Sequence, residues 1–559
     1  MTILKRIHTL LFICLGMSLM AQEAGEDWYH KDPSEGLNGV SIEKTYEQLL
    51  KGRASTPVVV AIIDSGIDIE HEDLKDNIWV NKDEIPDNGI DDDNNGYIDD
   101  VHGWNFIGGK DGKNVGPDTY EVTRIYGKLK YKYENAKRDQ LNKDQQKEYD
   151  LYQEVKKSVE EKREGAEKNL KQIGDLEATI MSGLDAIGKV TGDKVLAGMN
   201  LDSISSEDPN FAIGQQVLKQ YSMQNPDLGN IDQIKVEIKE ALQGDKQRFE
   251  DQLEYAYNPD FDTRLIVGDD TSNKKEIGYG NNDVEGPDAL HGTHVGGIVG
   301  AVRNNDLGMD GVADNVLLMS VRAVPDGDER DKDVANAIRY AVDNGASIIN
   351  MSFGKGYSPD KEIVDEAVRY AAENDVLLVH AAGNSALNTD IENNFPNDAY
   401  EKKTGFFLWR WLKKKGKAKN WIEVGALNYK QGENLSAPFS NYAKKNVDIF
   451  APGMKIYATV PNDKYRYLQG TSMASPVVAG IAAVLRSYFP TLTAEQTKDI
   501  IMNSGILMDD MVLIPGADGK KASFTELSVS GKVANLYNAV KMAMNTKGKK
   551  KIKVKGNRA

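Results

Sequence analysis

The chain of 559 residues has only one cysteine, Cys14, which lies inside an apolar N-terminal segment. Without a second cysteine no intrachain disulfide can form, so packing, together with any bound cations, must stabilise the fold. The apolar run at residues 10–20 is too short to cross a bilayer as a helix. A formal net charge of −17 argues against nucleic acid as a general partner.

The first residues follow the order of a secretion signal. Lys5 and Arg6 precede the apolar run at residues 10–20, and Ala21 and Gln22 follow it. This order predicts a signal peptide over residues 1–21 and export to the periplasm, the outer surface or the medium. Because a lipoprotein signal needs a small residue before its cysteine, the Ile13-Cys14 pair fits one poorly.

Residues 468–480 place Ser472 between small residues, at the start of an apolar helix predicted over residues 472–484. The free amides and the positive dipole end of such a helix would stabilise an anion beside the hydroxyl. Gly470 allows a substrate carbonyl to approach, and Pro476 falls in the first helical turn, where its missing N–H costs little. Ser472 is therefore a candidate nucleophile. The alternative is an ordinary helix start rich in small residues.

A serine nucleophile needs a base and an orienting carboxylate, and both have candidates. The apolar run at residues 58–63 predicts a strand buried on both faces of a parallel sheet, and Asp64 follows it at the edge where α/β active sites lie. The alternative for Asp64 is a turn residue. His291 precedes a helix, and His294, one turn later, is better explained as a packed structural histidine. A zinc pair is disfavoured because H-E-x-x-H would need a glutamate between them.

With these segments in the order Asp, His, Ser, the chain resembles the subtilase family of subtilisin-like serine proteases. The matching motifs are D-S-G from Asp64, H-G-T-H from His291 and G-T-S-M-A-S-P from Gly470. The resemblance covers roughly residues 56–106 and 283–543. It implies an α/β fold with a doubly wound parallel sheet.

The resemblance also implies roles in a secreted endopeptidase that works through an acyl-enzyme intermediate. Ser472 would attack the scissile carbonyl, His291 would take and return the proton, and Asp64 would hold the imidazole. Asn384, in the A-A-G-N that ends the apolar run from residue 375, matches the family's side-chain donor to the oxyanion. A simple turn asparagine is the alternative.

Residues 348–354 resemble the family strand that pairs with an extended peptide substrate by backbone hydrogen bonds. Two short segments should line the pocket for P1, the residue before the cleaved bond. They are Ser352, Phe353 and Gly354, and Ala381, Ala382 and Gly383. Their small residues, with Phe353 nearby, favour an apolar P1 side chain in a protein or peptide substrate.

The acidic stretch at residues 87–100 contains D-x-D-x-N-G, the first part of an EF-type calcium loop. The ligands expected for Ca²⁺ are Asp91, Asp93, Asn95, Asp99 and Asp100. The bidentate glutamate is missing, since position twelve is His102, and a solvated acidic turn is the alternative. The family resemblance implies a second site joining Asp73 to Asn305.

A long insertion separates Asp64 from His291. Between residues 110 and 280 charged residues dominate and apolar residues recur at helical spacing, so we expect a large helical subdomain. Its stripe includes Tyr126, Leu129, Tyr133, Tyr152, Val155, Val159, Ile173, Ile180 and Leu184. Its role is open between partner binding, substrate gating, folding assistance and simple decoration.

The predicted organisation is a signal peptide (1–21), an N-terminal strap (22–55), a peptidase domain (56–545) interrupted by the insertion (110–280), and a basic disordered tail (546–559). Aromatic residues beside lysines at 406–415 could contact a membrane, although an inserted hairpin is the better explanation. The rival to an enzyme is a non-catalytic or gated protease-fold scaffold whose helical insert binds a partner.

Overall fold

The computed structural model describes residues 24–192, 196, 203, 205–223, 229–400 and 416–550. The described residues form two compact units, one of residues 122–261 and one of residues 24–121 and 262–550. The predicted signal peptide, the aromatic segment at 406–415 and most of the predicted basic tail lie outside the described residues.

The larger unit is built on a nine-stranded sheet with the order β10-β13-β7-β6-β5-β4-β1-β3-β2. Its strands are β1 Val58–Asp64, β2 Gly103–Asn105, β3 Val316–Arg322, β4 Ile348–Met351, β5 Leu377–Ala381, β6 Trp421–Leu427, β7 Ile449–Pro452, β10 Ile506–Leu507 and β13 Lys532–Val533. All neighbours pair in parallel except β10 and β13 at the edge, which are antiparallel. The strand expected from the apolar run before Asp64 is β1, which lies between β4 and β3 in the sheet.

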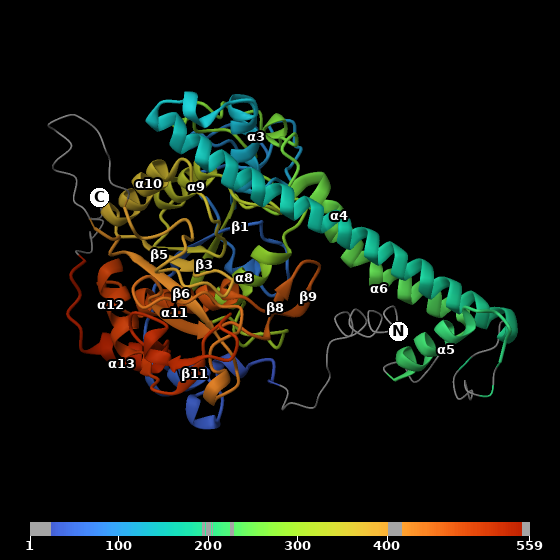
Figure 1. Cartoon of the computed structure of the whole chain (residues 1–559). Coiled ribbons are helices and arrows are strands. Elements are labelled where there is room, and N and C mark those ends of the chain that lie inside the picture. The colour runs from blue at the N-terminus through green and yellow to red at the C-terminus, as the bar shows by residue number, and fades with distance from the viewer. Residues whose placement is uncertain are drawn as a thin grey trace. The chain divides into compact units, whose positions relative to one another are not determined.

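Side chains of β1 alternate between two separate cores. Val60 and Ile62 belong to the cluster on one face, and Ala61 and Ile63 belong to the cluster on the other. Figure 1 shows α9 and α10 covering one face, with α11, α12 and α13 on the opposite one. A strand buried on both sides in this way is why the run before Asp64 is continuously apolar. The doubly wound parallel sheet predicted from the sequence is confirmed.

The helices of this unit are α2 Ile42–Thr45, α7 Arg264–Val267, α8 Leu290–Gly300, α9 Asp331–Asp343, α10 Lys361–Glu373, α11 Thr471–Tyr488, α12 Ala494–Ser504 and α13 Leu536–Met544. Two antiparallel hairpins complete it, β8 Ile456–Val460 with β9 Lys464–Leu468, and β11 Met511–Leu513 with β12 Lys521–Ser523. The helix predicted over residues 472–484 lies within α11, which begins one residue earlier and ends four residues later.

The N-terminal residues after 24 pack onto this unit. Trp28 and Tyr29 are buried in the same core as α11 and α13. Asn38 donates its amide to the carbonyl oxygens of residues 428–430 at 2.9–3.3 Å. Ser41 accepts a hydrogen bond from Asn535, 494 positions later in the chain. These contacts hold the segment as a strap across the helical face.

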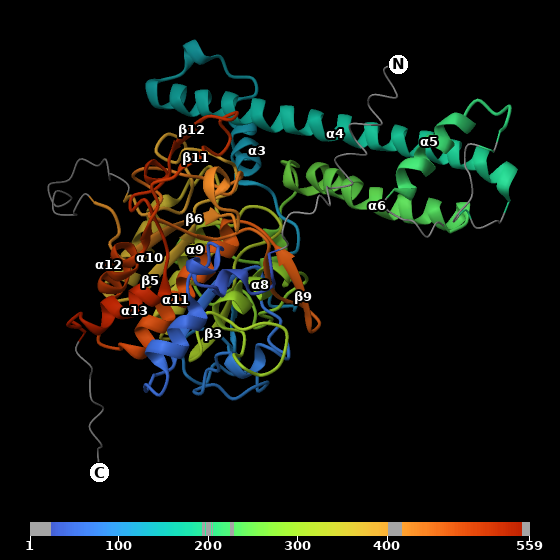
Figure 2. The ribbon, with the colours of Figure 1, turned by 90° about the horizontal axis from the view of Figure 1, so that it is seen from below.

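The smaller unit contains α3 Glu121–Tyr133, α4 Lys143–Thr191, α5 Phe211–Ser222 and α6 Ile231–Asp251. The first residue of α3, Glu121, is the last residue of the first segment of the larger unit. Figure 2 shows α6 running along α4, and the two helices are in contact. Every apolar residue of the predicted stripe is at least nine-tenths buried. Glu177, a polar residue between Ile173 and Ile180 of the stripe, forms an ion pair with Lys246 of α6. The prediction of long amphipathic helices is therefore confirmed.

The helical unit is narrower than the 110–280 predicted for the insertion. Residues before Val122 and after Phe261 belong to the larger unit, within which they form backbone bridges: Asn281 pairs with Asn105 of β2, and Pro117 pairs with Asp326 after β3. Arg330 contacts both flanks, donating to the Asp118 carboxylate at 3.2 Å and to the Thr263 hydroxyl at 3.4 Å. The chain thus leaves and re-enters the larger unit beside one guanidinium.

Among the helices of the described residues, none combines the length and the apolar character that a bilayer crossing requires.

Candidate active site

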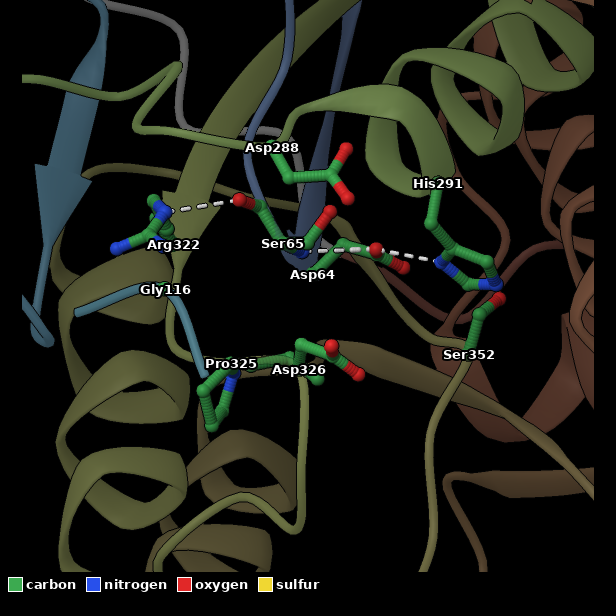
Figure 3. A pocket seen from close by; sticks show the side chains of 10 residues that line it. Asp64, Ser65, Gly116, Asp288, His291, Arg322, Pro325, Asp326 and Ser352 are labelled. Carbon is green, nitrogen blue, oxygen red and sulfur yellow. Dashed lines mark hydrogen bonds and ion pairs between the residues drawn. The ribbon is translucent and has the colours of Figure 1, made fainter. Parts of the chain in front are cut away.

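Asp64 and His291 meet at the carboxyl edge of the sheet. Nδ1 of His291, in the first turn of α8, lies 2.6 Å from Oδ1 of Asp64, the last residue of β1 (Figure 3). The helix and the loop after β1 touch backbone to backbone, since a Cβ at Gly292 would lie 2.1 Å from the carbonyl oxygen of Gly66. Glycine at position 292 therefore lets α8 approach the loop closely enough for Asp64 and His291, 227 positions apart in the sequence, to form a contact.

The environment makes His291 a stronger base. Burial alone would lower the pKa of its imidazole, but the charge of Asp64 and the hydrogen bond to it outweigh that effect and raise the pKa above 6.5. The carboxylate accepts from Nδ1, so in the neutral imidazole Nε2 keeps its lone pair. His291 is also reachable, because 37% of its side chain is exposed against 2% for Asp64.

His294 has a different environment one turn further along α8. It is fully buried, and its Nε2 lies 3.1 Å from the carbonyl oxygen of Ile456 and 3.0 Å from that of Arg466. Burial lowers its pKa to about 4. His294 ties the helix to the β8–β9 hairpin, as expected of a structural histidine.

Ser472 lies at the second position of α11, which packs against α8. Its hydroxyl donates to the backbone carbonyl oxygen of Ser352 at 3.1 Å. At this position the backbone amide of Ser472 is one of those at the helix start that lack an intrahelical acceptor.

Asn384 is held with a defined orientation. Its Oδ1 accepts from the amide of Thr471 at 2.8 Å and from the Thr471 hydroxyl at 2.9 Å, and that hydroxyl in turn accepts from the amide of Gly383 at 3.0 Å. The Nδ2 of Asn384 therefore points away from Thr471. A Cβ at Gly470 would come within 3.3 Å of this nitrogen, so glycine keeps the space beside it open. Thr471 was missed by sequence reasoning, although it stands next to the nucleophile.

The two predicted substrate-lining segments follow β4 and end β5, which are neighbours in the sheet. Gly354 is exposed, and Phe353 is half-buried with its ring 6.1 Å from that of His380. Gly383 is also partly exposed, while Ala381 is buried. The side chains of Ala382 and Ser352 pack within the fold. Ala382 is fully buried in a core cluster.

The Ser352 side chain is 4% exposed. Its hydroxyl accepts from Asn350 at 2.9 Å and contacts the carbonyl oxygen and the hydroxyl of two α11 residues, Ser472 at 3.0 Å and Ser475 at 2.8 Å. The side chain therefore braces the helix that carries the nucleophile.

Asn394 joins the two glycines of this region and was missed by sequence reasoning. A Cβ at Gly354 would lie 2.8 Å from its Oδ1, and one at Gly383 would lie 3.6 Å from its Nδ2. The Nδ2 donates to the carbonyl oxygen of Ala382 at 3.1 Å. No local motif marks this residue, because the loop that carries it follows the A-A-G-N segment without a recognisable pattern.

The family model for the subtilase family matches residues 55–528. The chain belongs to the subtilase family. It is 37% identical over 255 residues to a thermophilic serine proteinase of Bacillus sp. (strain AK1), a match that covers 44% of this chain and 55% of that protein. The chain thus spans about half the length of this relative.

Two further relatives are matched over more of their length. Subtilisin DY of Bacillus licheniformis is 34% identical, with 39% of this chain and 72% of that protein covered. Thermitase of Thermoactinomyces vulgaris is 37% identical, with 38% and 69% covered. The solved structure of the prenylagaramide maturation protease PagA is 25% identical and has a TM-score of 0.35, with 46% of this chain and 83% of that chain covered.

Asn384→Ala in this subtilase is expected to lower kcat about 100- to 1000-fold with little change in KM. The amide would contact charge that develops only in the transition state, so its loss affects the chemical step. Steady-state hydrolysis of a peptide substrate measures this. Asn397→Ala is the matched control, because its amide donates to the backbone of Asn394 in the same loop. An unchanged kcat in Asn384→Ala would contradict the assignment.

The acidic loop brings together fewer residues than the motif predicted. Ligand oxygens of Asp93, Asp100 and Glu84 lie within 4.8 Å of one another. Glu84, which sequence reasoning missed because it precedes the motif, also accepts from the amides of Asp92, Asp93 and Asp99 at 2.9–3.1 Å. Burial raises the pKa of Asp100 to about 6, with the charge of Asp93 adding to the effect. A cation would relieve this crowding of carboxylates.

The remaining predicted ligands shape the loop. Asp91 accepts from the amides of Asn95 and Gly96 at 3.0 and 2.9 Å, and Asp99 from those of Asn88 and Gly89 at 3.1 and 2.9 Å. The Nδ2 of Asn95 donates to both Asp93 and Asp100 at 3.1 Å.

Asp73 and Asn305, the second predicted pair, lie in contact. Nδ2 of Asn305 donates to Oδ1 of Asp73 at 2.7 Å, and the amide of Met309 and the hydroxyl of Tyr465 each lie 3.3 Å from Oδ2. Burial raises the pKa of Asp73. Its carboxylate is therefore satisfied by hydrogen bonds within the fold.

Proposed function

We propose that this subtilase is a serine endopeptidase that hydrolyses peptide bonds of protein substrates through an acyl-enzyme intermediate. The observation that carries the proposal is the 2.6 Å contact of Asp64 with His291 at the carboxyl end of β1. Ser472 is hydrogen-bonded to Ser352 after β4, and Asn384 after β5 accepts from Thr471 beside Ser472. Family membership supports the same activity. A structural ion pair alone would not require the imidazole to be partly exposed.

In the acylation step, the Nε2 lone pair of His291 accepts the proton of the Ser472 hydroxyl as Oγ attacks the carbonyl carbon. Asp64 holds the Nδ1–H tautomer and stabilises the imidazolium that forms. The imidazolium then gives the proton to the leaving amine. In deacylation, His291 takes a proton from the water molecule that attacks the acyl carbonyl carbon, and it returns the proton to Oγ of Ser472 as the acyl group leaves.

The carbonyl oxygen becomes negative as the tetrahedral intermediate forms. Nδ2 of Asn384 and the backbone amide of Ser472 are the donors available to it, and the N-terminal end of α11 adds a favourable potential. Because Thr471 fixes the amide of Asn384, this donor would need no reorganisation during the reaction.

A fluorophosphonate probe, which reacts with activated serines, tests the proposal on the purified full chain. Labelling that is lost in Ser472→Ala would support an assembled site. Absence of labelling from a folded sample would refute it and favour the non-catalytic scaffold with a partner-binding insert.

We infer that the acidic loop binds Ca²⁺ as a structural ion. The oxygen-rich donor set of Glu84, Asp93 and Asp100 suits a hard cation, which would neutralise carboxylates that otherwise repel. The pair Asp73 and Asn305 offers one carboxylate and one amide oxygen for a second site, if the Asn305 amide turns over.

Chelation is expected to lower the melting temperature by about 5–10 °C, since an ion that binds only the folded state stabilises it by mass action. Differential scanning calorimetry with Ca²⁺ and with EGTA measures this. Asp93→Asn should remove the difference. Asp83→Asn, an exposed acid two positions from Asn81 and outside the cluster, should keep it. A difference that persists in Asp93→Asn would refute the site.

We also propose that the protein is exported, on the basis of Lys5, Arg6 and the apolar run that follows. Fractionation of expressing cells, with N-terminal sequencing of the processed protein, tests this. Processed protein in the periplasm, on the outer surface or in the medium is the expected result, and unprocessed protein in the cytoplasm would contradict it.

A further inference from the structure

Lys355 is a buried lysine that directly follows residues 348–354, the segment predicted to pair with an extended peptide substrate. This substrate-binding segment borders the catalytic residues. The carbonyl oxygen of Ser352 accepts from the Ser472 hydroxyl at 3.1 Å, and Ser352 lines the same cavity as His291 (Figure 3). The side chain of Lys355 is only 1% exposed. A buried ammonium is costly unless it is paired and hydrogen-bonded, so its partners show what it holds in place.

Three groups surround this ammonium. Nζ of Lys355 lies 2.8 Å from Oε2 of Glu121 and 2.9 Å from Oδ1 of Asp331, and it donates to the carbonyl oxygen of Glu329 at 2.8 Å. Glu121 and Asp331 are both less than one-tenth exposed. We refer to Lys355, Glu121, Glu329 and Asp331 as the Lys355 cluster. Loss of the ammonium would leave two buried carboxylates without the cation that they share.

The Lys355 cluster joins the substrate-binding segment to the starts of two helices. Glu121 begins α3, the helix through which the chain enters the helical unit. Asp331 begins α9, and its carboxylate also accepts from the Ser358 hydroxyl at 2.9 Å and from the Asp360 amide at 2.8 Å. All of these residues belong to the larger unit. The position of the chain after the substrate-binding segment therefore depends on where α3 and α9 begin.

The backbone of Lys355 is fixed as well. Its amide donates to the carbonyl oxygen of Phe395 at 2.9 Å, and its carbonyl oxygen accepts from the amide of Phe395 at 2.9 Å. Gly354, the last residue of the substrate-binding segment, has no side chain and is free to adopt many backbone conformations. The fixed end of the segment is therefore Lys355, which is held by both its backbone and its side chain.

A segment that is fixed in advance binds an extended peptide more tightly than one that must be ordered on binding, because the ordering consumes part of the binding free energy. Backbone hydrogen bonds between the peptide and such a segment are formed in the ground state and are kept in the transition state. A disturbed segment should therefore raise KM and leave kcat almost unchanged.

We propose that the ion pair of Lys355 with Glu121 positions the substrate-binding segment, so that the first residue of α3 contributes to substrate affinity. Lys355 is a positioning residue, which acts on the substrate through the backbone of residues 352–354. The inference rests on the proposed endopeptidase activity. It gives the point where the helical insertion begins a function in substrate binding.

Steady-state hydrolysis of a long peptide and of a short acyl ester by the full chain tests the inference. Glu121→Gln keeps an acceptor for Lys355 but removes the charge, and it should raise KM for the peptide about tenfold with little change in kcat. Lys355→Met should raise KM about 100-fold. The ester has no residues to pair with the segment, so its hydrolysis should be unaffected. An unchanged KM for the peptide in Glu121→Gln, or an equal loss with the ester, would overturn the inference. If Lys355→Met does not fold, Glu121→Gln decides.

Lys498→Met is the matched control. Lys498 of α12 is partly buried and also donates to a carboxylate and a backbone carbonyl oxygen, those of Asp448 and Trp421. This variant should keep the wild-type KM. An equal rise in KM would mean that the loss of any such ion pair loosens the enzyme, and the specific role of the Lys355 cluster would be refuted.

Hydrogen exchange separates this inference from the proposed activity, because it needs no turnover. In the Ser472→Ala chain, the amides of residues 352–358 should exchange about tenfold faster once Glu121→Gln is added. Equal exchange would overturn the inference even if the wild-type chain hydrolyses peptides. Conversely, a wild-type chain that hydrolyses nothing refutes the endopeptidase, while faster exchange would still support the positioning role of Lys355 and Glu121.

Discussion

Ser472→Ala is expected to lower kcat about a million-fold, because the attacking oxygen is removed while the base and oxyanion donors remain. The fold should survive, since alanine suits the start of α11 and the lost hydroxyl makes one hydrogen bond, to the Ser352 carbonyl. Peptide hydrolysis at high enzyme concentration, with circular dichroism on the same sample, measures both effects.

Ser487→Ala is the matched control for this change. It lies on the same helix, it is 2% exposed, and its hydroxyl donates to the carbonyl oxygen of Thr56 at 2.8 Å. It should lose about 1 kcal/mol of unfolding free energy and keep its turnover. More than 1% residual activity in Ser472→Ala would rule out the proposed nucleophile.

Asp64→Asn should lower kcat about 10,000-fold at neutral pH, because an amide facing Nδ1 favours the wrong imidazole tautomer. The pH profile should change as well. With Asp64 present, the pKa of His291 is raised, so activity is lost as the pH falls through a value above 6.5. Without the carboxylate that pKa falls, and the acidic limb of kcat/KM moves to lower pH.

The pH profile of kcat/KM, recorded with concentrated enzyme, measures this shift. Asp68→Asn is the comparison, since this carboxylate lies in the same loop and accepts from the amides of Glu70 and Asn462, at 3.2 and 2.9 Å, away from the imidazole. The acidic limb of the kcat/KM profile of Asp68→Asn should not shift. If the acidic limb of kcat/KM does not shift in Asp64→Asn, a group other than Asp64 sets the pKa of His291.

Local sequence sufficed to predict strand β1 and the start of the helix that carries Ser472. The run before Asp64 had to be apolar throughout because both faces of β1 are covered, and the small residues around Ser472 are needed where α11 begins. The insertion was visible for a similar reason, since one face of its helices is buried. Each of these patterns lies within a single helix or strand.

Residues that act across elements could not be predicted in the same way. Arg322 lies opposite Asp64 only because β1 and β3 pair in one particular register. Glu84 joins Asp93 and Asp100 through the path of a loop, and Asn394 meets two glycines from a segment without a motif. The bounds of the helical unit also depended on which flanking residues pair with the sheet.

Arg330 binds both Asp118 and Thr263, so the two points where the chain leaves and re-enters the larger unit lie close together. Because both crossing points lie within reach of one side chain, a short turn between Glu121 and Asp262 could close the chain where residues 122–261 now depart. A reporter protein or a foreign binding module whose two ends lie close together could be inserted at the same two points. A protease engineer could therefore graft new partners onto this scaffold without redesigning its sheet.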